Sequence, residues 1–330
     1  MGTSTHEPRI TVGGPPLGAG SRFRAHVEIC RIDHWFKNVF VLPGVVVAIA
    51  LSADLPVGEI TWHVAVALVA VCLVASSNYV LNELLDARTD LHHPLKRLRP
   101  VPSGRVNVRV AYVQWVVLMI VGVGLGVVVD AQLAATLLGL WVMGCLYNTP
   151  PIRTKDHAYV DVLSESINNP IRFLVGWFAV TTTLVPPASL LVSYWMIGAY
   201  FMAAKRFAEY RDFERGDGVD TAVRYRKSFA GYTSERLLVS IMFYASAAML
   251  FFGAFIVRYR LELVLSFPLV AIFMAMYLRL SFRPDSPVEH PELLYRERGL
   301  MLVLAVTVVV MTVLLFVDLP FLSRLFEPSI

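Results

Sequence analysis

The chain has 330 residues, 56% of them hydrophobic, and its mean hydropathy is +0.61. A membrane-spanning helix needs about 20 mostly apolar residues, and many windows reach that length, so a soluble protein is excluded and one membrane domain is expected. The net charge of +4 does not indicate a nucleic-acid partner, because the basic residues lie between apolar segments and are explained by membrane topology. Three cysteines without a CxxC pair indicate neither a disulfide framework nor a zinc site.

The N-terminal segment differs in composition from the rest of the chain. Residues 1–24 are rich in Gly, Pro, Ser and Thr and lack the apolar stretch of a signal peptide. We therefore expect a disordered cytoplasmic tail over 1–24 and a membrane domain over 25–330.

The apolar segments predict an all-α fold, a polytopic membrane helical bundle of about nine transmembrane helices. The expected spans are 38–54, 62–84, 108–129, 132–147, 162–182, 188–207, 236–257, 262–280 and 299–319.

Basic residues alternate between the two sides of this bundle. They gather before the first span and in 85–107, 148–161, 208–235 and 281–298, whereas 55–61, 130–131 and 183–187 have no Lys or Arg. Only 258–261 breaks the pattern, with Arg258 and Arg260. The positive-inside rule then predicts a multi-pass protein of the cell inner (plasma) membrane, with its N-terminus, long loops and active site in the cytoplasm.

The end of the second span carries a cluster of acids. Residues four apart share a helix face, so Asn82, Asp86 and Asp90 stack on one side, and Glu83 adjoins them. Acids this close repel one another unless a cation lies between them. Mg²⁺ prefers oxygen ligands and is commonly shared between carboxylates and substrate phosphates. We expect Asn82, Glu83, Asp86 and Asp90 to bind Mg²⁺, with Asn82, Asp86 and Asp90 catalytic.

A basic run follows at once. Lys96, Arg97 and Arg99 offer cationic groups to phosphate oxygens, which arginine binds in bidentate fashion. The alternative is topogenic charge in contact with lipid headgroups. Directly after an acidic cluster of this type, phosphate binding is the preferred interpretation.

The run from Asn82 to Asp90 resembles the first acidic motif of the UbiA superfamily of membrane prenyltransferases. His93-Pro94, Lys96-Arg97, Arg99-Pro100 and Gly104 narrow the resemblance to the branch typified by decaprenyl-phosphate phosphoribosyltransferase. Further similarity covers most of the chain. It includes Arg31, Trp35, Lys37, Asn38 and Pro43 before the first span, Lys205-Arg206 and Glu209 after the sixth, Tyr232-Thr233 with Leu237-Leu238 before the seventh, and Pro291 to Leu294 with Arg298 and Leu300 in the last loop.

The superfamily's second motif pairs acids four apart, and Asp161 and Glu165 have that spacing, with Arg172 following. Asp161 also suits a helix start, where the dipole favours an acid. Glu165 lies deeper in an apolar segment and needs a cationic partner from Lys155, Arg172, Lys205 or Arg206. The segment 164–170 is more polar than the phosphoribosyl branch implies.

Two reactions follow from the resemblance. In the first, a diphosphate-containing donor, 5-phosphoribosyl diphosphate, transfers its sugar to a polyprenyl phosphate, as in arabinan precursor synthesis. In the second, a polyprenyl diphosphate alkylates an aromatic or other small acceptor, and Asp161 and Glu165 bind a second Mg²⁺. The cationic groups favour the first, because two phosphorylated substrates need more of them. Lys37, Lys96, Arg97, Arg99, Asp161, Glu165, Arg172, Lys205 and Arg206 are the expected substrate-binding residues.

A transporter of an anionic solute is a third and weaker alternative. Such folds bind at the midplane between paired repeats, whereas here the acids cluster near helix ends and no paired repeat is evident.

Overall fold

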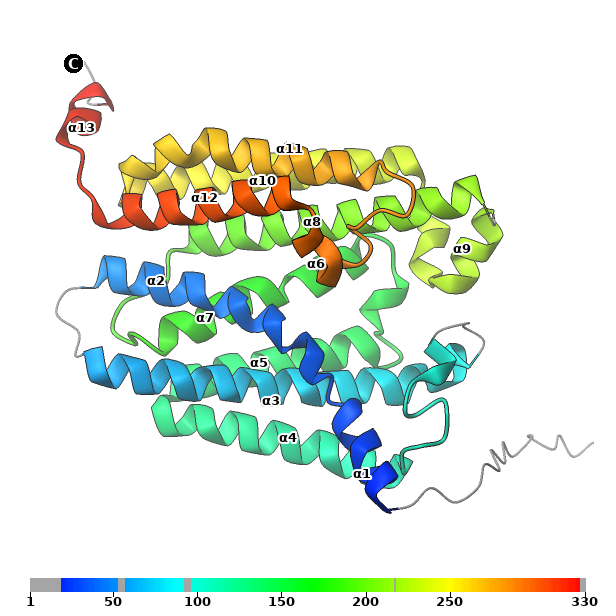
Figure 1. Ribbon diagram of the computed structural model, residues 1–330. Coiled ribbons are helices and arrows are strands. Elements are labelled where there is room, and N and C mark those ends of the chain that lie inside the picture. The colour runs from blue at the N-terminus through cyan, green and yellow to red at the C-terminus, as the bar shows by residue number, and fades with distance from the viewer. Residues whose placement is uncertain (1–18, 53–56, 92–95, 217, 327–330) are drawn as a thin grey trace, which may run out of the picture.

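The computed structural model describes residues 19–52, 57–91, 96–216 and 218–326, and over these ranges the chain is helical with no strand (Figure 1). The helices are α1 (Ala19–Glu28), α2 (Leu42–Leu51), α3 (Val57–Asp90), α4 (Val108–Val129), α5 (Ala131–Asn148), α6 (Val160–Ser166), α7 (Asn168–Phe178), α8 (Ala188–Arg215), α9 (Val219–Tyr225), α10 (Ser234–Tyr259), α11 (Phe267–Ser281), α12 (Arg298–Phe316) and α13 (Pro320–Phe326). Short 3₁₀ helices are η1 (Ile32–Val41), η2 (Lys96–Leu98), η3 (Thr154–Asp156), η4 (Lys227–Gly231), η5 (Leu261–Ser266) and η6 (Pro291–Arg296).

The predicted tail lies mainly outside the described residues. Its last part, from Ala19 onward, belongs to α1, so residues 19–24 are helical where disorder was expected. The buried side chains of Ala25 and Ile29 pack with Val80 of α3, which gives this helix an apolar contact to fold against.

The prediction of an all-α, multi-pass membrane protein is confirmed, but the count of nine spans is not. Within the described ranges, seven segments are long and apolar enough to cross a membrane. They are Gly20–Leu51, Val57–Asp90, Val108–Val129, Ala131–Asn148, Ser234–Tyr259, Leu261–Ser281 and Arg298–Phe316.

The predicted spans 162–182 and 188–207 are not among these seven. The first is divided at Ile167 into α6 and α7 and ends at Phe178. The second lies in α8, which continues to Arg215 and brings Lys205 and Arg206 into the helix. The first segment is therefore excluded by the break in its helix, and the second by the polar residues that α8 carries.

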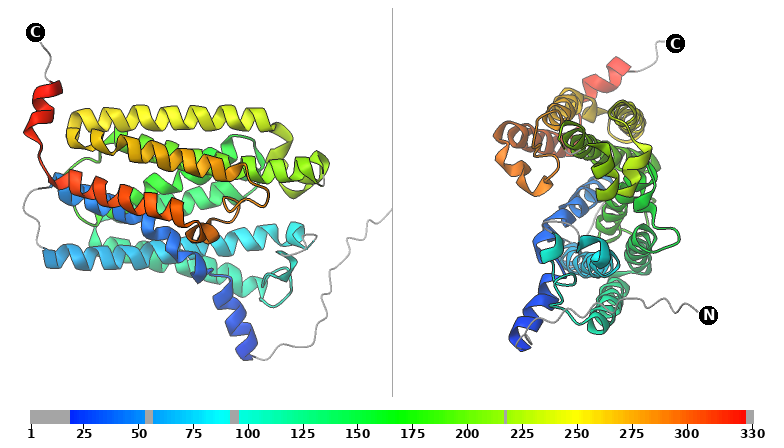
Figure 2. Two further views of the ribbon diagram at one scale, coloured as in Figure 1. Left: turned by 45° about the horizontal axis from the view of Figure 1, so that its top comes forward. Right: turned by 90° about the vertical axis from the view of Figure 1, so that its right-hand side faces the viewer.

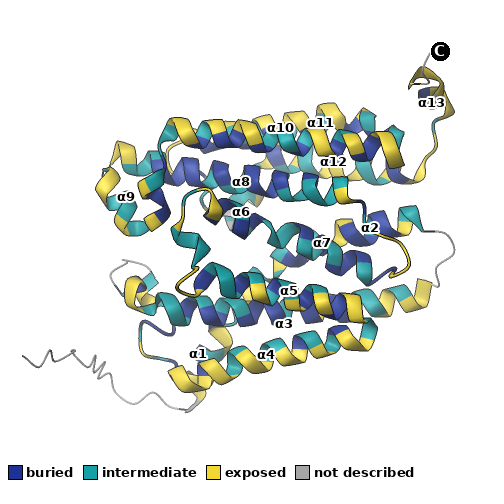
Figure 3. Ribbon diagram, turned by 180° about the vertical axis from the view of Figure 1, so that it is seen from behind, coloured by how far each residue is buried: buried dark blue, intermediate teal, exposed yellow. Residues whose placement is uncertain are grey.

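The helices form a layered bundle. In Figure 1, α3, α4 and α5 lie on one side, α8, α10, α11 and α12 on the other, and α2 and α7 between them; α3 packs on α4 and α5, and α8 packs on α10. The views in Figure 2 show the same separation. Exposed residues line the outer faces of α4, α10 and α11 (Figure 3), and many are large and apolar, including Val113, Val128, Phe243 and Leu250, as lipid contact requires.

Helices α2 and α7 cross at two glycines. A Cβ atom on Gly44 would collide with the backbone carbonyl of Phe173, and one on Gly176 would collide with that of Val41. Close approach of this kind is available only to glycine. The crossing fixes α7 against η1 and α2, the elements that hold part of the site below.

The polar segment 164–170 has a structural role at the junction of α6 and α7. Ser164 Oγ donates to the Val160 carbonyl, Ser166 Oγ to the Leu163 carbonyl, and Asn168 Nδ2 to the Glu165 carbonyl. The Leu163 carbonyl also accepts the Ile167 amide, so these side chains add hydrogen bonds around the junction. The polar side chains of this segment therefore bond to the backbone of α6 itself.

One of the two arginines that break the charge pattern, Arg260, has a structural role at the other end of the bundle. Arg260 Nη1 lies 2.6 Å from Asp318 Oδ1, just before α13. This arginine serves an ion pair between two connecting segments.

Candidate functional site

The centre of the site is the ammonium group of Lys155, in the loop after α5. Lys155 Nζ lies 2.9 Å from Asn82 Oδ1, 2.7 and 2.8 Å from the two Asp86 carboxylate oxygens, and 2.9 Å from Asn148 Oδ1. Arg153 Nη2 donates to the same Asp86 carboxylate at 2.8 Å. Burial lowers the pKa of Lys155 from its ordinary value, and Asp86 opposes that shift.

The oxygens around Lys155 fit a hard divalent cation. One carboxylate and two amide oxygens converge on a single point, which is a donor set that Mg²⁺ accepts when substrate phosphates and water complete its six positions. Asn82 and Asp86, one turn apart on α3, share this point as their spacing predicts. Asn148, at the end of α5, completes the set.

The other two acids of the first motif have different partners. Glu83 is 2% exposed and its Oε1 accepts a hydrogen bond from the Val101 amide at 2.9 Å, so it anchors the loop after α3. Asp90 lies 2.6 Å from Arg99 Nη1. Accordingly, no three His, Cys, Asp or Glu side chains converge as a metal site in the part of the chain described.

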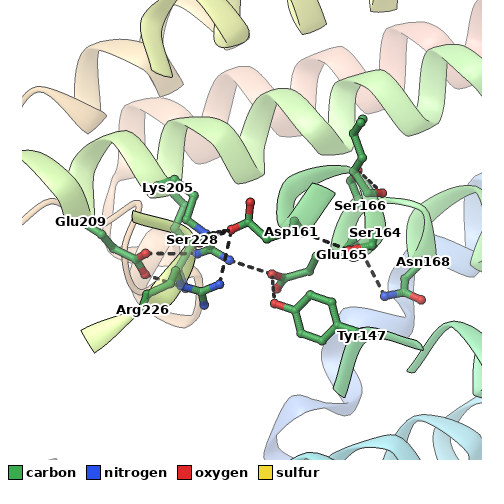
Figure 4. A network of polar contacts seen from close by, with 12 residues as sticks. Tyr147, Asp161, Ser164, Glu165, Ser166, Asn168, Lys205, Glu209, Arg226 and Ser228 are labelled. Carbon is green, nitrogen blue, oxygen red and sulfur yellow. Dashed lines mark hydrogen bonds and ion pairs between the residues drawn. The ribbon is translucent and has the colours of Figure 1, made fainter. Parts of the chain in front are cut away.

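The second acidic pair, Asp161 and Glu165, belongs to a network of polar contacts that also includes Glu209, Arg226 and Ser228 (Figure 4). Arg206 is 1% exposed, and its three nitrogens reach three carboxylates: Nε to Asp161 at 3.1 Å, Nη2 to Glu165 at 2.8 Å, and Nη1 to Glu209 at 3.1 Å. Asp161 is fully buried. It also accepts hydrogen bonds from Tyr232 Oη at 2.7 Å and Ser228 Oγ at 3.0 Å.

This pair does not fit a metal ion. Arg206 lies between Asp161 and Glu165, where the prenyl-transfer alternative requires a second Mg²⁺. Its fork matches the carboxylates in number and direction. Displacing it would leave a buried guanidinium without partners, which costs several kcal/mol.

Tyr147 connects the two acidic sets. Its hydroxyl donates to Glu165 Oε2 at 2.9 Å, and its ring centroid lies 5.9 Å from Lys155 Nζ. Arg226 lies 3.5 Å from Asp161 and within electrostatic range of Lys155 and Lys96. Helices α3, α5, α6 and α8 and the loops after α5 and α9 therefore build one continuous polar site.

The other residues that were predicted to bind substrate differ in their surroundings. Lys96 Nζ lies 4.6 Å from the ring centroid of Tyr225, and burial lowers its pKa while Asp90 opposes the shift. Lys205 lies 3.9 Å from Glu209. Lys37 contacts His34, Arg97 is exposed, and Arg172 donates to Asn38. His92, His93 and Pro94 lie outside the described residues.

Sequence reasoning did not assign several contributors to this site, which are Asn148, Arg153, Tyr147, Arg226, Ser228 and Tyr232. It named Lys155 only as a possible partner of Glu165, whereas the structure pairs Glu165 with Arg206 and Lys155 with Asp86. Lys155 stands 69 positions from Asp86, and Ser228 stands 67 from Asp161, so no spacing rule connects them. The sequence feature that could have indicated them is that polar residues occur at the end of α5 and in the loops rich in Lys and Arg.

Comparison with known proteins identifies the relatives of the chain. The UbiA prenyltransferase family matches residues 39–294. Decaprenyl-phosphate phosphoribosyltransferase of Mycolicibacterium smegmatis is 29% identical over 252 residues, which is 76% of this chain and 75% of that protein. The protein of the same name from Mycobacterium tuberculosis strain H37Rv is 30% identical over 228 residues, 69% of this chain and 72% of its own length.

Solved structures share the fold. A UbiA homolog from Archaeoglobus fulgidus bound to DMAPP and Mg²⁺ has a TM-score of 0.65 at 18% identity, covering 88% of this chain and 99% of that one. The same homolog bound to GPP and Mg²⁺ has a TM-score of 0.65 at 17% identity, covering 89% and 100%.

Proposed function

The chain belongs to the UbiA prenyltransferase family, and on this premise we propose that it transfers a 5-phosphoribosyl group from 5-phosphoribosyl diphosphate to a polyprenyl phosphate. One observation carries the choice of substrates: Arg206 fills the second acidic pair, so a single oxygen set that fits a metal ion stands among many cations. The relatives named as decaprenyl-phosphate phosphoribosyltransferases support the same choice.

The cations around the site suit two phosphorylated substrates. Lys155 and Arg153 lie beside Asp86, and Arg99 lies beside Asp90. Lys96 and Arg226 lie between the acidic sets, within electrostatic range of each other. The proposed donor carries a diphosphate and a phosphate, and the proposed acceptor carries a phosphate. Cationic side chains in this number can neutralise the negative charges of both substrates.

Asn82, Asp86 and Asn148 would hold Mg²⁺, which supplies charge neutralisation for the leaving diphosphate. A non-bridging oxygen of the acceptor phosphate attacks ribose C1, and the bond from C1 to the diphosphate oxygen breaks with its electron pair on the diphosphate. No general base is required, because the attacking phosphate is already anionic. Lys155 and Arg153 leave the Asp86 carboxylate for the diphosphate oxygens, and the surrounding protein orients both substrates.

We further propose that the site faces the cytoplasm of a cell with a plasma membrane. The loops carrying Lys96, Lys155, Arg226 and Arg283 lie at one end of the bundle, the end of α9 in Figure 1, and α13 lies at the other. Cytoplasmic enrichment of Lys and Arg is the general rule, and a soluble donor would enter there.

Prenyl transfer is the second candidate, favoured by the family description and by solved homologues bound to DMAPP or GPP. In that reaction Asn82 and Asp86 would hold the metal of the prenyl donor. The closed Asp161–Arg206–Glu165 arrangement weighs against it.

The test uses purified full-length protein in detergent with Mg²⁺, radiolabelled 5-phosphoribosyl diphosphate and a polyprenyl phosphate. We expect label in the lipid fraction, loss of at least about 100-fold in rate for Asp86→Asn, and normal rate for Asp318→Asn, an exposed acid at the opposite end. Consumption of prenyl diphosphates alone would contradict the proposal.

A further inference from the structure

Arg172 of α7 differs from the other arginines of the bundle interior. Arg206, Arg99 and Arg153 each lie within 3.1 Å of a carboxylate. Arg172 forms no ion pair with any residue that the structure describes. Its Nε donates to Asn38 Oδ1 at 3.0 Å, and its Nη1 reaches the Asn168 carbonyl at 3.4 Å.

These two contacts leave the guanidinium incompletely satisfied. It has five N–H donors and cannot lose its charge. Nη2 has no acceptor among the described residues, and the side chain is only partly buried, so it borders accessible space. If Arg172 served only to hold α7 against η1, the contacts of its Nε and Nη1 would be explained. Such a role does not explain retention of an unpaired charge, which is costly at membrane depth.

The groups around Arg172 come from distant parts of the chain. Tyr79 and Cys72 of α3 and Tyr194 of α8 lie within electrostatic range of it, and none is an acid. Asn38 is fixed in turn, because its Nδ2 donates to Cys72 Sγ at 3.1 Å. The guanidinium is thus held in place by a neutral shell, with hydroxyl groups nearby.

The position of Arg172 joins the polar site to the apolar core. Tyr79 lies within range of both Arg172 and Glu165, which links this group to the acidic sets. The neighbouring Phe173 belongs to the apolar core, where it is buried and stacks on Trp177 with ring centroids 6.2 Å apart. An anion bound by Arg172 would therefore lie near the acidic sets, at the edge of the apolar core.

We propose that Arg172, with the hydroxyl of Tyr79, binds a phosphate monoester; the Tyr194 hydroxyl already donates to the Phe40 carbonyl. The inference rests on the proposed function, in which both substrates carry such a group: the 5-phosphate of the donor and the phosphate of the lipid acceptor. A fork of N–H donors beside a neutral hydroxyl matches a dianionic phosphate in charge and geometry. The missing counter-charge of Arg172 is then supplied by substrate.

Binding measurements on full-length Arg172→Gln test this. The probes are farnesyl phosphate, 5-phosphoribosyl diphosphate with Mg²⁺, and inorganic diphosphate with Mg²⁺, followed by calorimetry or ligand-induced thermal stabilisation. We expect a loss of about 10- to 100-fold in affinity for one of the first two and unchanged binding of inorganic diphosphate. Arg172→Lys keeps the positive charge but lacks the planar set of N–H donors, so its affinity for that probe should lie between those of the wild type and Arg172→Gln. Arg260→Gln, at the opposite end, is the matched control.

The identity of the affected probe assigns the subsite. Loss for farnesyl phosphate places the acceptor there, and loss for 5-phosphoribosyl diphosphate places the donor's 5-phosphate there. Unchanged affinity for both, in a variant that unfolds at the wild-type temperature, overturns the proposal. If wild-type protein transfers no phosphoribosyl group yet loses farnesyl phosphate binding through Arg172→Gln, the proposed function fails while the subsite stands.

Discussion

Lys155 takes the position of a cation within the oxygen set. Its ammonium lies 2.7 to 2.9 Å from oxygens of Asn82, Asp86 and Asn148. An ammonium and Mg²⁺ cannot share this position, because like charges in contact repel strongly. Binding of metal therefore requires Lys155 to move, and the diphosphate of the donor offers it a new partner.

We predict opposite effects of Lys155→Gln with and without diphosphate. Without diphosphate, metal affinity should rise about tenfold, since a competing charge is removed. With inorganic diphosphate present it should fall, because a phosphate contact is lost. Mn²⁺ binding followed by electron paramagnetic resonance measures both. Lys227→Gln, 76% exposed, is the control, and unchanged metal affinity without diphosphate would contradict the competition.

Arg206 is expected to be essential for folding rather than replaceable by another cation. Arg206→Lys retains the charge but reaches fewer than three carboxylates, and breaking a buried pair costs about 3–5 kcal/mol. The measurement is the thermal unfolding temperature. Arg215→Lys, further along α8 and 42% exposed, should change it little. Equal stability of the two variants would show that the buried cluster is not structural.

At the scale of elements, α7 is positioned by two separate devices. Its start is set by the junction at Ile167, where Asn168 bonds the Glu165 carbonyl, and its middle is set by the glycine crossing with α2. Arg172 lies between the two. The orientation of its guanidinium therefore depends on helix packing as well as on Asn38.

Gly44→Ala should disturb that packing. The added methyl group meets the Phe173 carbonyl, and overpacking of this kind costs about 1–3 kcal/mol. We expect a lower unfolding temperature. Gly139→Ala on α5, where no atom lies within 4 Å of the new Cβ, is the control and should be neutral or stabilising. An unaltered unfolding temperature in Gly44→Ala would argue against a close α2–α7 contact.

Sequence patterns predicted the helices more completely than the contacts of individual residues. Apolar length correctly predicted the all-α membrane bundle, in which seven of the described segments are long and apolar enough to cross a membrane. It joined α6 and α7 into one, because hydropathy does not register a one-residue break such as Ile167. Helical spacing correctly paired Asn82 with Asp86. It grouped Glu83 with them, although the loop after α3 supplies Glu83 with the Val101 amide instead. The contact between Lys155 and Asp86 joins residues 69 positions apart, and no sequence pattern predicts a contact of that kind.

At the scale of the whole molecule, the two ends of the bundle differ in chemistry. One end holds the acidic sets and their cations. The other has a cavity of about 340 Å³ lined by residues that include Glu59, His63, Asp130 and Thr181. Few charged residues line this cavity, and in the proposed orientation it opens outside the cell.

Cysteine accessibility in intact cells tests that orientation. In a background lacking Cys30, Cys72 and Cys145, Val185→Cys, at a position 87% exposed between α7 and α8, should react with an impermeant maleimide. Lys227→Cys, 76% exposed in wild type, should react only after permeabilisation. The reverse pattern would invert the topology.

The ion pairs of the resting site have a consequence for biogenesis. Asp86, Asp90, Asp161 and Glu165 each contact a cation that the chain itself provides. Many small metal-binding domains, by contrast, fold only when the metal binds. Here insertion and assembly in the membrane can finish before any metal is acquired. A chelator should therefore silence the enzyme without unfolding it, and added Mg²⁺ should restore activity.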